Sequence, residues 1–202
     1  SDLLSRAWTI FTKNAVPYVA AVIVVGLIIV VANAIGLLVH QAVGTMLTIL
    51  VMGPLALGLC KMGLTGARGG VVNFATLFEG RENIVNATLA NHFISIFVAI
   101  GFVFCFLPAF LVKALYLTTY FFMLEGPKDF WGAMESSRKF VMSNFVQWLI
   151  VTVVAAVLNI AGVCLCGVGV LVSMPVTVIF IALAYDQQRH GGATTVSAEA
   201  VE

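Results

Sequence analysis

Charged side chains are scarce in this sequence. Aspartate, glutamate, lysine and arginine together make up 9% of the 202 residues, whereas hydrophobic residues make up 61% and the mean hydropathy is +1.10. A soluble domain carries about a quarter charged residues, so this chain has too few ionisable groups to cover a surface that faces water. The net charge of +1 also gives no basis for binding nucleic acid. We therefore predict an integral membrane protein with lipid as its main solvent and no nucleic-acid partner.

Catalytic and metal-binding motifs are also missing. The sequence contains no H-E-x-x-H motif, no serine in a nucleophile elbow and no phosphate-binding loop. No cysteine has the neighbouring histidines or cysteines that would complete a tetrahedral zinc set. Four acidic residues cluster at one predicted membrane boundary and have basic neighbours, so we expect ordinary interfacial pairing rather than paired-carboxylate catalysis: Glu79, Glu82, Glu125 and Asp129. The histidines, His40, His92 and His190, form no pair on facing spans at matched depth. We predict a protein that is not an enzyme, with no catalytic residue, cofactor or metal ion.

Six long apolar runs divide the chain. A helix needs about 20 apolar residues to cross a bilayer. The runs, each a predicted transmembrane helix, cover about residues 15–39, 45–64, 87–107, 109–124, 145–163 and 168–185. Residues 1–186 therefore form a single all-α integral membrane domain. Residues 187–202 are a small polar tail that we expect to be flexible.

Basic residues fall almost entirely on one side of this arrangement. With six spans, the turns around residues 36–44, 107–108 and 161–167 share one side of the membrane and carry no charge. Every lysine and arginine except Lys113 falls on the other side. Because loops rich in lysine and arginine stay in the cytoplasm, we predict that the charged side and both termini are cytoplasmic.

The chain contains three units of similar design, each a short amphipathic helix at the cytoplasmic interface followed by a hairpin of two spans. At a constant offset of 130 residues, matching positions in the first and third units are Ile10 and Phe140, Asn14 and Asn144, Val16 and Val146, and Tyr18 and Trp148. The second helix of each hairpin carries a proline, Pro54, Pro108 or Pro175, where we expect helix breaks. Coincidence among apolar runs is the alternative interpretation.

A family resemblance covers well over half of the chain, from residue 68 to 186. The matching features, in order, are Ala67 and Arg68; residues 74–80; Leu107 and Pro108; Lys113, Ala114 and Tyr116; Ala133 and residues 136–138; residues 166–169; Pro175; and Ala184 and Tyr185. In these features the chain resembles an uncharacterised bacterial inner-membrane family, similar to the membrane domain attached to some glycerophosphodiester phosphodiesterases. The resemblance implies a six-helix fold in the bacterial inner (cytoplasmic) membrane. It implies no activity, since the catalytic domain of those phosphodiesterases is a separate soluble barrel.

Lys113 is the only charged residue well inside an apolar run. Ionisable groups at membrane depth are costly and often functional. Lys113 lies five residues after Pro108, so its side chain can instead extend towards the outer headgroups. The sharper hypothesis is that Lys113 holds an anionic lipid headgroup or a substrate. Arg138 and Lys139, in a predicted amphipathic helix within residues 126–144, are further candidates for lipid or substrate contact.

These observations favour a non-catalytic membrane protein, either an accessory or scaffold subunit of a larger membrane assembly or a protein that organises lipid. The expected partners are membrane lipids and other membrane protein subunits. A small transporter or channel is an alternative, because prolines in the second helix of each hairpin can break helices around a central path. A pigment- or haem-binding subunit is a second alternative, because a histidine near a span end can ligate haem.

Overall fold

The computed structural model describes residues 2–104, 106–126, 129–164 and 168–191, and within these ranges it contains helices and no strand. The helices, in chain order, are α1 (Asp2–Lys13), α2 (Ala15–Leu38), α3 (Gln41–Ala67), the 3-10 helix η1 (Phe74–Asn83), α4 (Ile84–Phe104), α5 (Phe106–Leu115), α6 (Thr119–Glu125), α7 (Phe130–Ser143), α8 (Phe145–Cys164) and α9 (Val170–His190). The all-α prediction is confirmed for this part of the chain. The end of α9 shows that residues 187–190, predicted as tail, are helical.

Five of the helices are long and apolar enough to cross a membrane. They are α2, α3, the segment Ile84–Val103 of α4, α8 and α9, and they coincide with five of the six predicted spans. The predicted fourth span, residues 109–124, is instead divided between α5 and α6, with a turn at residues 116–118. Each part is too short to cross a bilayer alone.

The break in the fourth apolar run is stabilised by a serine from α7. The hydroxyl of Ser137 donates a hydrogen bond to the carbonyl oxygen of Leu115 at 2.8 Å, where α5 ends. The Thr118 hydroxyl lies 2.8 Å from Ser137 Oγ; because Ser137 has only one proton to give, Thr118 is the donor of this second bond. Carbonyls at a helix end need such partners. The helix can therefore end here inside apolar surroundings.

Pro54 and Pro175 do not break the helices that contain them, so the predicted helix breaks are wrong at these two positions. Helix α3 continues through Pro54 and α9 continues through Pro175. An interior proline removes one hydrogen bond, and apolar helices tolerate this loss where neighbouring helices pack around the freed backbone group; Pro175 is fully buried. Pro108 lies in the first turn of α5, where the backbone N–H that proline lacks has no intrahelical partner anyway.

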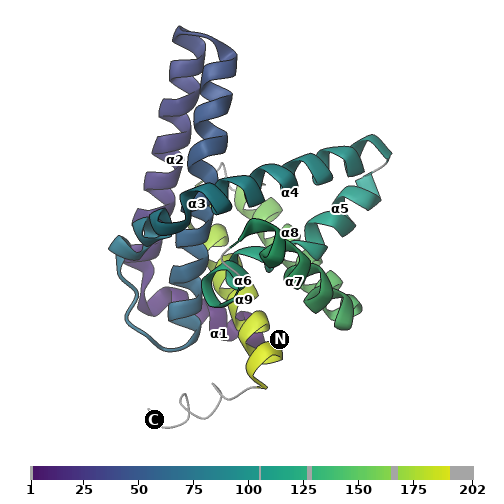
Figure 1. Ribbon diagram of the computed structural model, residues 1–202. Helices are drawn as coiled ribbons and strands as arrows, with labels where there is room; N and C mark the ends of the chain where they lie inside the picture. The colour runs from purple at the N-terminus through teal and green to yellow at the C-terminus, as the bar shows by residue number, and fades with distance from the viewer. Residues whose placement is uncertain (1, 105, 127–128, 165–167, 192–202) are drawn as a thin grey trace.

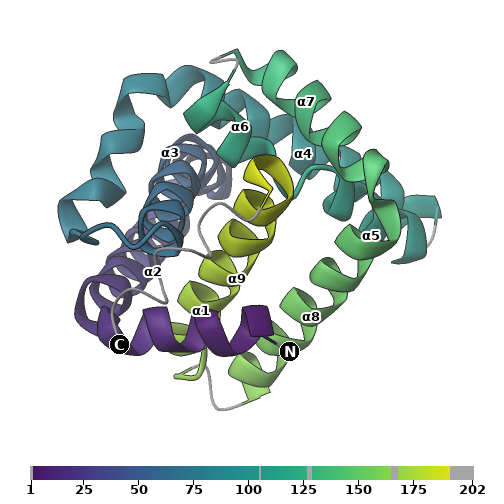
Figure 2. The same ribbon diagram turned by 90° about the horizontal axis from the view of Figure 1, so that it is seen from below.

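The three hairpins diverge from a shared base. The α2–α3 hairpin extends upwards in Figure 1, while the α4–α5 hairpin points to the side. The α8–α9 pair forms the third hairpin. Seen from below, α9 lies near the centre with α1, α3, α6, α7 and α8 around it (Figure 2). Residues 179–186 of α9 are all buried, so α9 is the helix around which the core is built.

Small residues allow the two helices of each hairpin to approach closely. A glycine in the first helix of each hairpin faces a small residue of the second, and a Cβ atom on that glycine would lie within 3.0 Å of its neighbour. The facing pairs are Gly36 and Gly44, Gly101 and Ala109, and Gly162 and Ser173. Small residues at such crossings are typical of helices packed in membranes.

The matched aromatic positions of the first and third units have similar packing roles. Tyr18 and Trp148 are both 1% exposed. The Tyr18 hydroxyl donates to the carbonyl oxygen of Met62 at 3.0 Å, which joins α2 to α3. Trp148 Nε1 donates to Gln188 Oε1 at 2.6 Å, which joins α8 to α9. Each aromatic therefore fastens the first helix of its hairpin to the second.

A short helix precedes each hairpin: α1 before α2, η1 before α4, and α7 before α8. The buried residues of α7 are Ala133, Met134, Ser137 and Val141. Arg138 and Lys139 of the same helix are exposed. This division follows the helical spacing of the apolar residues, and the α7 helix packs against α4, α5 and α6 with its apolar side.

Candidate functional site

A cluster of charged and polar side chains joins the ends of three helices at the base of the molecule. This charged junction consists of Arg68 at the end of α3, Glu125 at the end of α6, and Tyr185, Asp186 and Arg189 in the last turns of α9. The Arg68 guanidinium contacts one oxygen of Glu125, and its Nε lies 2.9 Å from Asp186 Oδ1. Arg189 Nε lies 3.4 Å from the other oxygen of Glu125, to which the Tyr185 hydroxyl donates at 3.0 Å. Glu125 therefore lies between two arginines.

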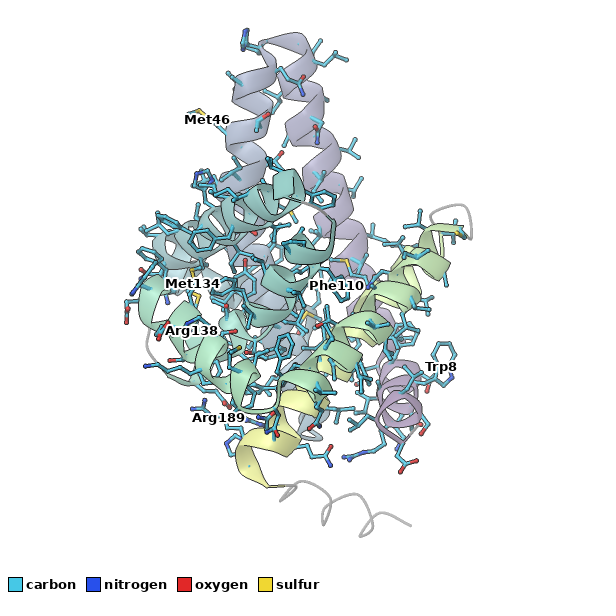
Figure 3. All side chains as sticks on the ribbon, turned by 90° about the vertical axis from the view of Figure 1, so that its right-hand side faces the viewer. Trp8, Met46, Phe110, Met134, Arg138 and Arg189 are labelled. Carbon is cyan, nitrogen blue, oxygen red and sulfur yellow. The ribbon has the colours of Figure 1, made fainter. Side chains whose placement is uncertain are left out.

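The carboxylates of the junction are the more buried partners. The side chain of Asp186 is 4% exposed and that of Glu125 is 16% exposed, whereas that of Arg68 is 37% exposed. Carboxylates this buried need paired charges. Burial alone would lower the pKa of Arg68, but hydrogen bonds to Asp186 and Glu125 outweigh it and raise the pKa. The Arg189 guanidinium also lies over the Phe122 ring, 4.7 Å from its centroid. Figure 3 shows Arg189 near the C-terminal end of α9.

The two arginines occupy matching places in the first and third units. Arg68 follows Pro54 by 14 residues, and Arg189 follows Pro175 by the same 14 residues. They contact the two oxygens of Glu125, which belongs to the unit between them. Arg68, Glu125 and Arg189, one from the end of each unit, are thus joined by ion pairs. The junction therefore links the three units to one another.

A cavity of about 400 Å³ adjoins the junction. It is lined by Lys61, Arg68, Glu79, Asn83 and Glu125, together with apolar residues of α3 and α6. Lys61 and Glu79 pair across it at 2.5 Å, and the remaining charges belong to the junction. The expected pairing is confirmed for Glu79 and Glu125. Asp129 instead accepts from the backbone N–H of Gly132 at the start of α7, and the side chain of Glu82 lies outside the described residues. Because the charged groups of the cavity neutralise one another, the described residues that line it offer a ligand no unpaired charge.

A second and larger hollow lies between the α4–α5 hairpin and the α8–α9 pair. This Lys113 groove has a volume of about 660 Å³. Its lining is mainly apolar, and Phe110 of this lining is labelled in Figure 3. The residues that line it are Val98, Phe102, Ala109, Phe110, Lys113, Leu117, Thr152, Ala155, Ala156, Asn159, Ile160, Met174, Thr177, Val178 and Ile181. The groove follows from the divergence of the two hairpins, which leaves a wedge between them.

Four polar residues of the described part of the chain line the Lys113 groove: Lys113, Thr152, Asn159 and Thr177. Lys113 is exposed and forms no ion pair with any residue that the structure describes. Asn159 Nδ2 donates to the carbonyl oxygen of Ala155 at 2.8 Å and to Thr177 Oγ1 at 3.1 Å, which joins α8 to α9. The groove therefore combines apolar walls with a lysine that has no ion-pair partner among the described residues. This combination suits an amphiphile that carries a negative charge.

Arg138 and Lys139 do not share this groove. Both lie on α7 and pair with Glu135 of the same helix: Arg138 Nε and Nη2 donate to its oxygens at 2.8 and 2.7 Å, and Lys139 Nζ lies at 3.4 Å. The hydrogen bond from Arg138 lowers the pKa of Glu135 to about 2. The predicted contact residues are thus separated: Lys113 lines the groove, while Arg138 and Lys139 are engaged in local pairs on α7.

The histidines make ordinary contacts. His40 Nδ1 accepts from the backbone N–H of Ala42 at the start of α3, and His190 Nδ1 lies 3.2 Å from Asp186 Oδ1. The His92 ring lies against Phe93. Among the residues that the structure describes, no three His, Cys, Asp or Glu side chains are grouped so that they could hold a metal ion.

No family model, curated protein or solved structure matches this chain. The resemblance to a bacterial inner-membrane family therefore stays a prediction. The function has to be argued from the geometry of the groove and the junction.

Sequence reasoning missed the junction and the groove for different reasons. Arg68 and Asp186 are 118 residues apart in the chain, and no local spacing relates them. The equal distances from Pro54 to Arg68 and from Pro175 to Arg189 are the one signal that links the arginines. The groove has no sequence signal apart from Lys113, because its walls depend on the angle between two hairpins.

Proposed function

We propose that this chain is a non-catalytic integral membrane protein that binds a phospholipid in the Lys113 groove. It lies in the bacterial inner membrane with both termini in the cytoplasm, where α1, η1 and α7 rest at the interface. Helices α5 and α6 together make the fourth of six crossings. Their combined length, residues 106–125, supports this, because about 20 residues span the hydrocarbon core.

The observation that carries the proposal is Lys113, which lines an apolar groove and has no ion-pair partner among the described residues. A charged side chain within the apolar part of a bilayer is costly unless an opposite charge lies against it. The phosphate of a bound lipid offsets this cost, since it places an opposite charge against the ammonium group and fills the apolar walls with acyl chain. The groove volume of about 660 Å³ lies within the usual range for pockets that enclose small molecules.

The groove supports the lipid-organising role more directly than the role of an assembly subunit, because it opens between two hairpins to which lipid has access. Other membrane protein subunits remain proposed partners. The transporter alternative loses its main support, since α3 and α9 continue through Pro54 and Pro175. The haem alternative has no support in the contacts of His40, His92 or His190.

Replacement of Lys113 tests the proposal. Lys113→Met keeps a similar length and removes the charge, whereas Lys113→Arg keeps the charge. A hydrogen bond to a charged group contributes about 1.5–3 kcal/mol, so we expect Lys113→Met to weaken lipid binding by roughly 10- to 100-fold. The measurement is native mass spectrometry of protein extracted in a mild detergent, in which the mass of the retained molecule separates a phospholipid from free phosphate.

The control is Arg138→Met, which removes a positive charge outside the groove. We expect wild type, Lys113→Arg and Arg138→Met to retain one groove lipid, and Lys113→Met to lose it. If Lys113→Met keeps the same lipid with the same affinity as wild type, the proposal is wrong.

A further inference from the structure

A second groove lies on the α1 side of the α8–α9 pair. It runs between α1, the first half of α8 and α9, and has a volume of about 1120 Å³. We call it the α1 groove; its lining includes Leu4 and Arg6 of α1, Gln147, Val151 and Val154 of α8, and Phe180 of α9. The residues of α8 that line it differ from those that line the Lys113 groove. The two grooves therefore lie on different faces of α8.

The α1 groove is polar at one end and apolar at the other. Its polar end, at the charged base of the molecule, carries Arg6 with Asn144, Gln147 and Gln187. The apolar end is formed by Val151, Val154 and Phe180. From the start of α8 at Phe145 to Val154 the helix rises about 14 Å, at 1.5 Å per residue. This is close to half of the hydrocarbon core of about 30 Å, so the groove has the length of one bilayer leaflet.

Arg6 is the basic group at the polar end of this groove. It is half-buried and forms no ion pair with a described residue. The other arginines whose side chains the structure describes, Arg68, Arg138 and Arg189, are all paired with carboxylates. Asp2 lines the same end of the groove. Trp8, labelled in Figure 3, projects outwards from α1 with 52% of its surface exposed, and tryptophan is enriched at the level of lipid headgroups.

We infer that the α1 groove is a second phospholipid site, occupied from the cytoplasmic leaflet. The lipid phosphate lies against the Arg6 guanidinium, which presents its donors in a fork that matches phosphate geometry. An acyl chain lies along α8 against Val151, Val154 and Phe180. This inference shares with the proposed function the placement of the chain in a membrane, and it does not depend on Lys113. The α8–α9 pair would then hold one lipid on each side.

Two independent substitutions test the α1 groove. Arg6→Met removes the charge, and Val154→Trp fills the apolar end. Their matched controls are Arg6→Lys, which keeps the charge, and Val157→Trp, which places the same bulk on an exposed position of α8 that lines neither groove. Each variant is stripped of lipid in detergent, checked for helical content and a single size-exclusion peak, and titrated with phosphatidylglycerol under native mass spectrometry.

We expect wild type, Arg6→Lys and Val157→Trp to bind two lipids. Arg6→Met and Val154→Trp should each bind one, with at least tenfold weaker binding at the second site, and Arg6→Met with Lys113→Met should bind none. If both Arg6→Met and Val154→Trp bind two lipids as wild type does, the inference is wrong; should Val154→Trp fail to fold, Arg6→Met alone decides. If Arg6→Met loses a lipid and Lys113→Met does not, the proposed function is wrong and this inference stands. If Lys113→Met loses a lipid and Arg6→Met does not, this inference is wrong and the proposed function stands.

Discussion

Replacing Glu125 by glutamine tests whether the charged junction holds the three units together. Glutamine keeps the size of the side chain and removes the negative charge between Arg68 and Arg189. Removal of one partner from a fully buried ion pair costs about 3–5 kcal/mol. Here the side chains of Glu125, Arg68 and Arg189 are 16%, 37% and 30% exposed, and Arg68 keeps its contact with Asp186. Solvent screening and the remaining pair therefore reduce the expected loss of stability to about 2 kcal/mol.

The assay for Glu125→Gln is thermal unfolding in a mild detergent, followed by circular dichroism. For a chain of this length, about 1 kcal/mol corresponds to a shift of roughly 2–4 °C in Tm, so the expected decrease is about 4–8 °C. Glu135→Gln is the matched control, because it removes a carboxylate from the exposed pairs of α7; its decrease should be clearly smaller. A Tm for Glu125→Gln equal to that of wild type or of the control would refute the assignment of the junction as the link between the units.

Two further predictions concern packing and are measured by the same unfolding assay. Gly58→Ala should destabilise the protein by about 1–3 kcal/mol or more through overpacking, because its Cβ would clash with the carbonyl oxygen of Leu77. Gly26→Ala, whose Cβ would have no neighbour within 4 Å, should leave stability unchanged or slightly higher. Equal stabilities of these two variants would contradict the close approach of α3 and η1. Ser137→Ala should cost about 1–3 kcal/mol, because the carbonyl of Leu115 loses its hydrogen bond, and an unchanged Tm would show that this bond does not stabilise the end of α5.

The long helices could be predicted from the sequence because their signal is local. Five apolar runs of sufficient length became α2, α3, α4, α8 and α9, as expected where lipid replaces water as the solvent. The buried side of α7 is also a local feature, because helical spacing places Ala133, Ser137 and Val141 on one side of the helix. Each of these features is decided by residues within a few turns of one another.

The break of the fourth run and the arrangement of the hairpins depend on distant residues. The turn after Leu115 is accompanied by a hydrogen bond from Ser137, which lies in a later helix, and hydropathy alone predicts one continuous span. At Pro54 and Pro175 the sequence predicted a helix break where the helix in fact continues. Packing of neighbouring helices around a proline can maintain a helix that would break in an isolated peptide. The charge of Lys113 was visible in the sequence, but the groove around it required the positions of α4, α8 and α9.

Photo-crosslinking tests the presence of a lipid in the Lys113 groove most directly. The protein is reconstituted with a phospholipid that carries a photoactivatable group in its acyl chain, irradiated, and digested for mass spectrometry of the crosslinked peptides. We predict crosslinks concentrated on the groove residues Ala156, Met174 and Thr177, and their loss in Lys113→Met. Crosslinks spread equally over exposed positions outside the groove such as Val30, and unchanged by Lys113→Met, would contradict a bound lipid in the groove.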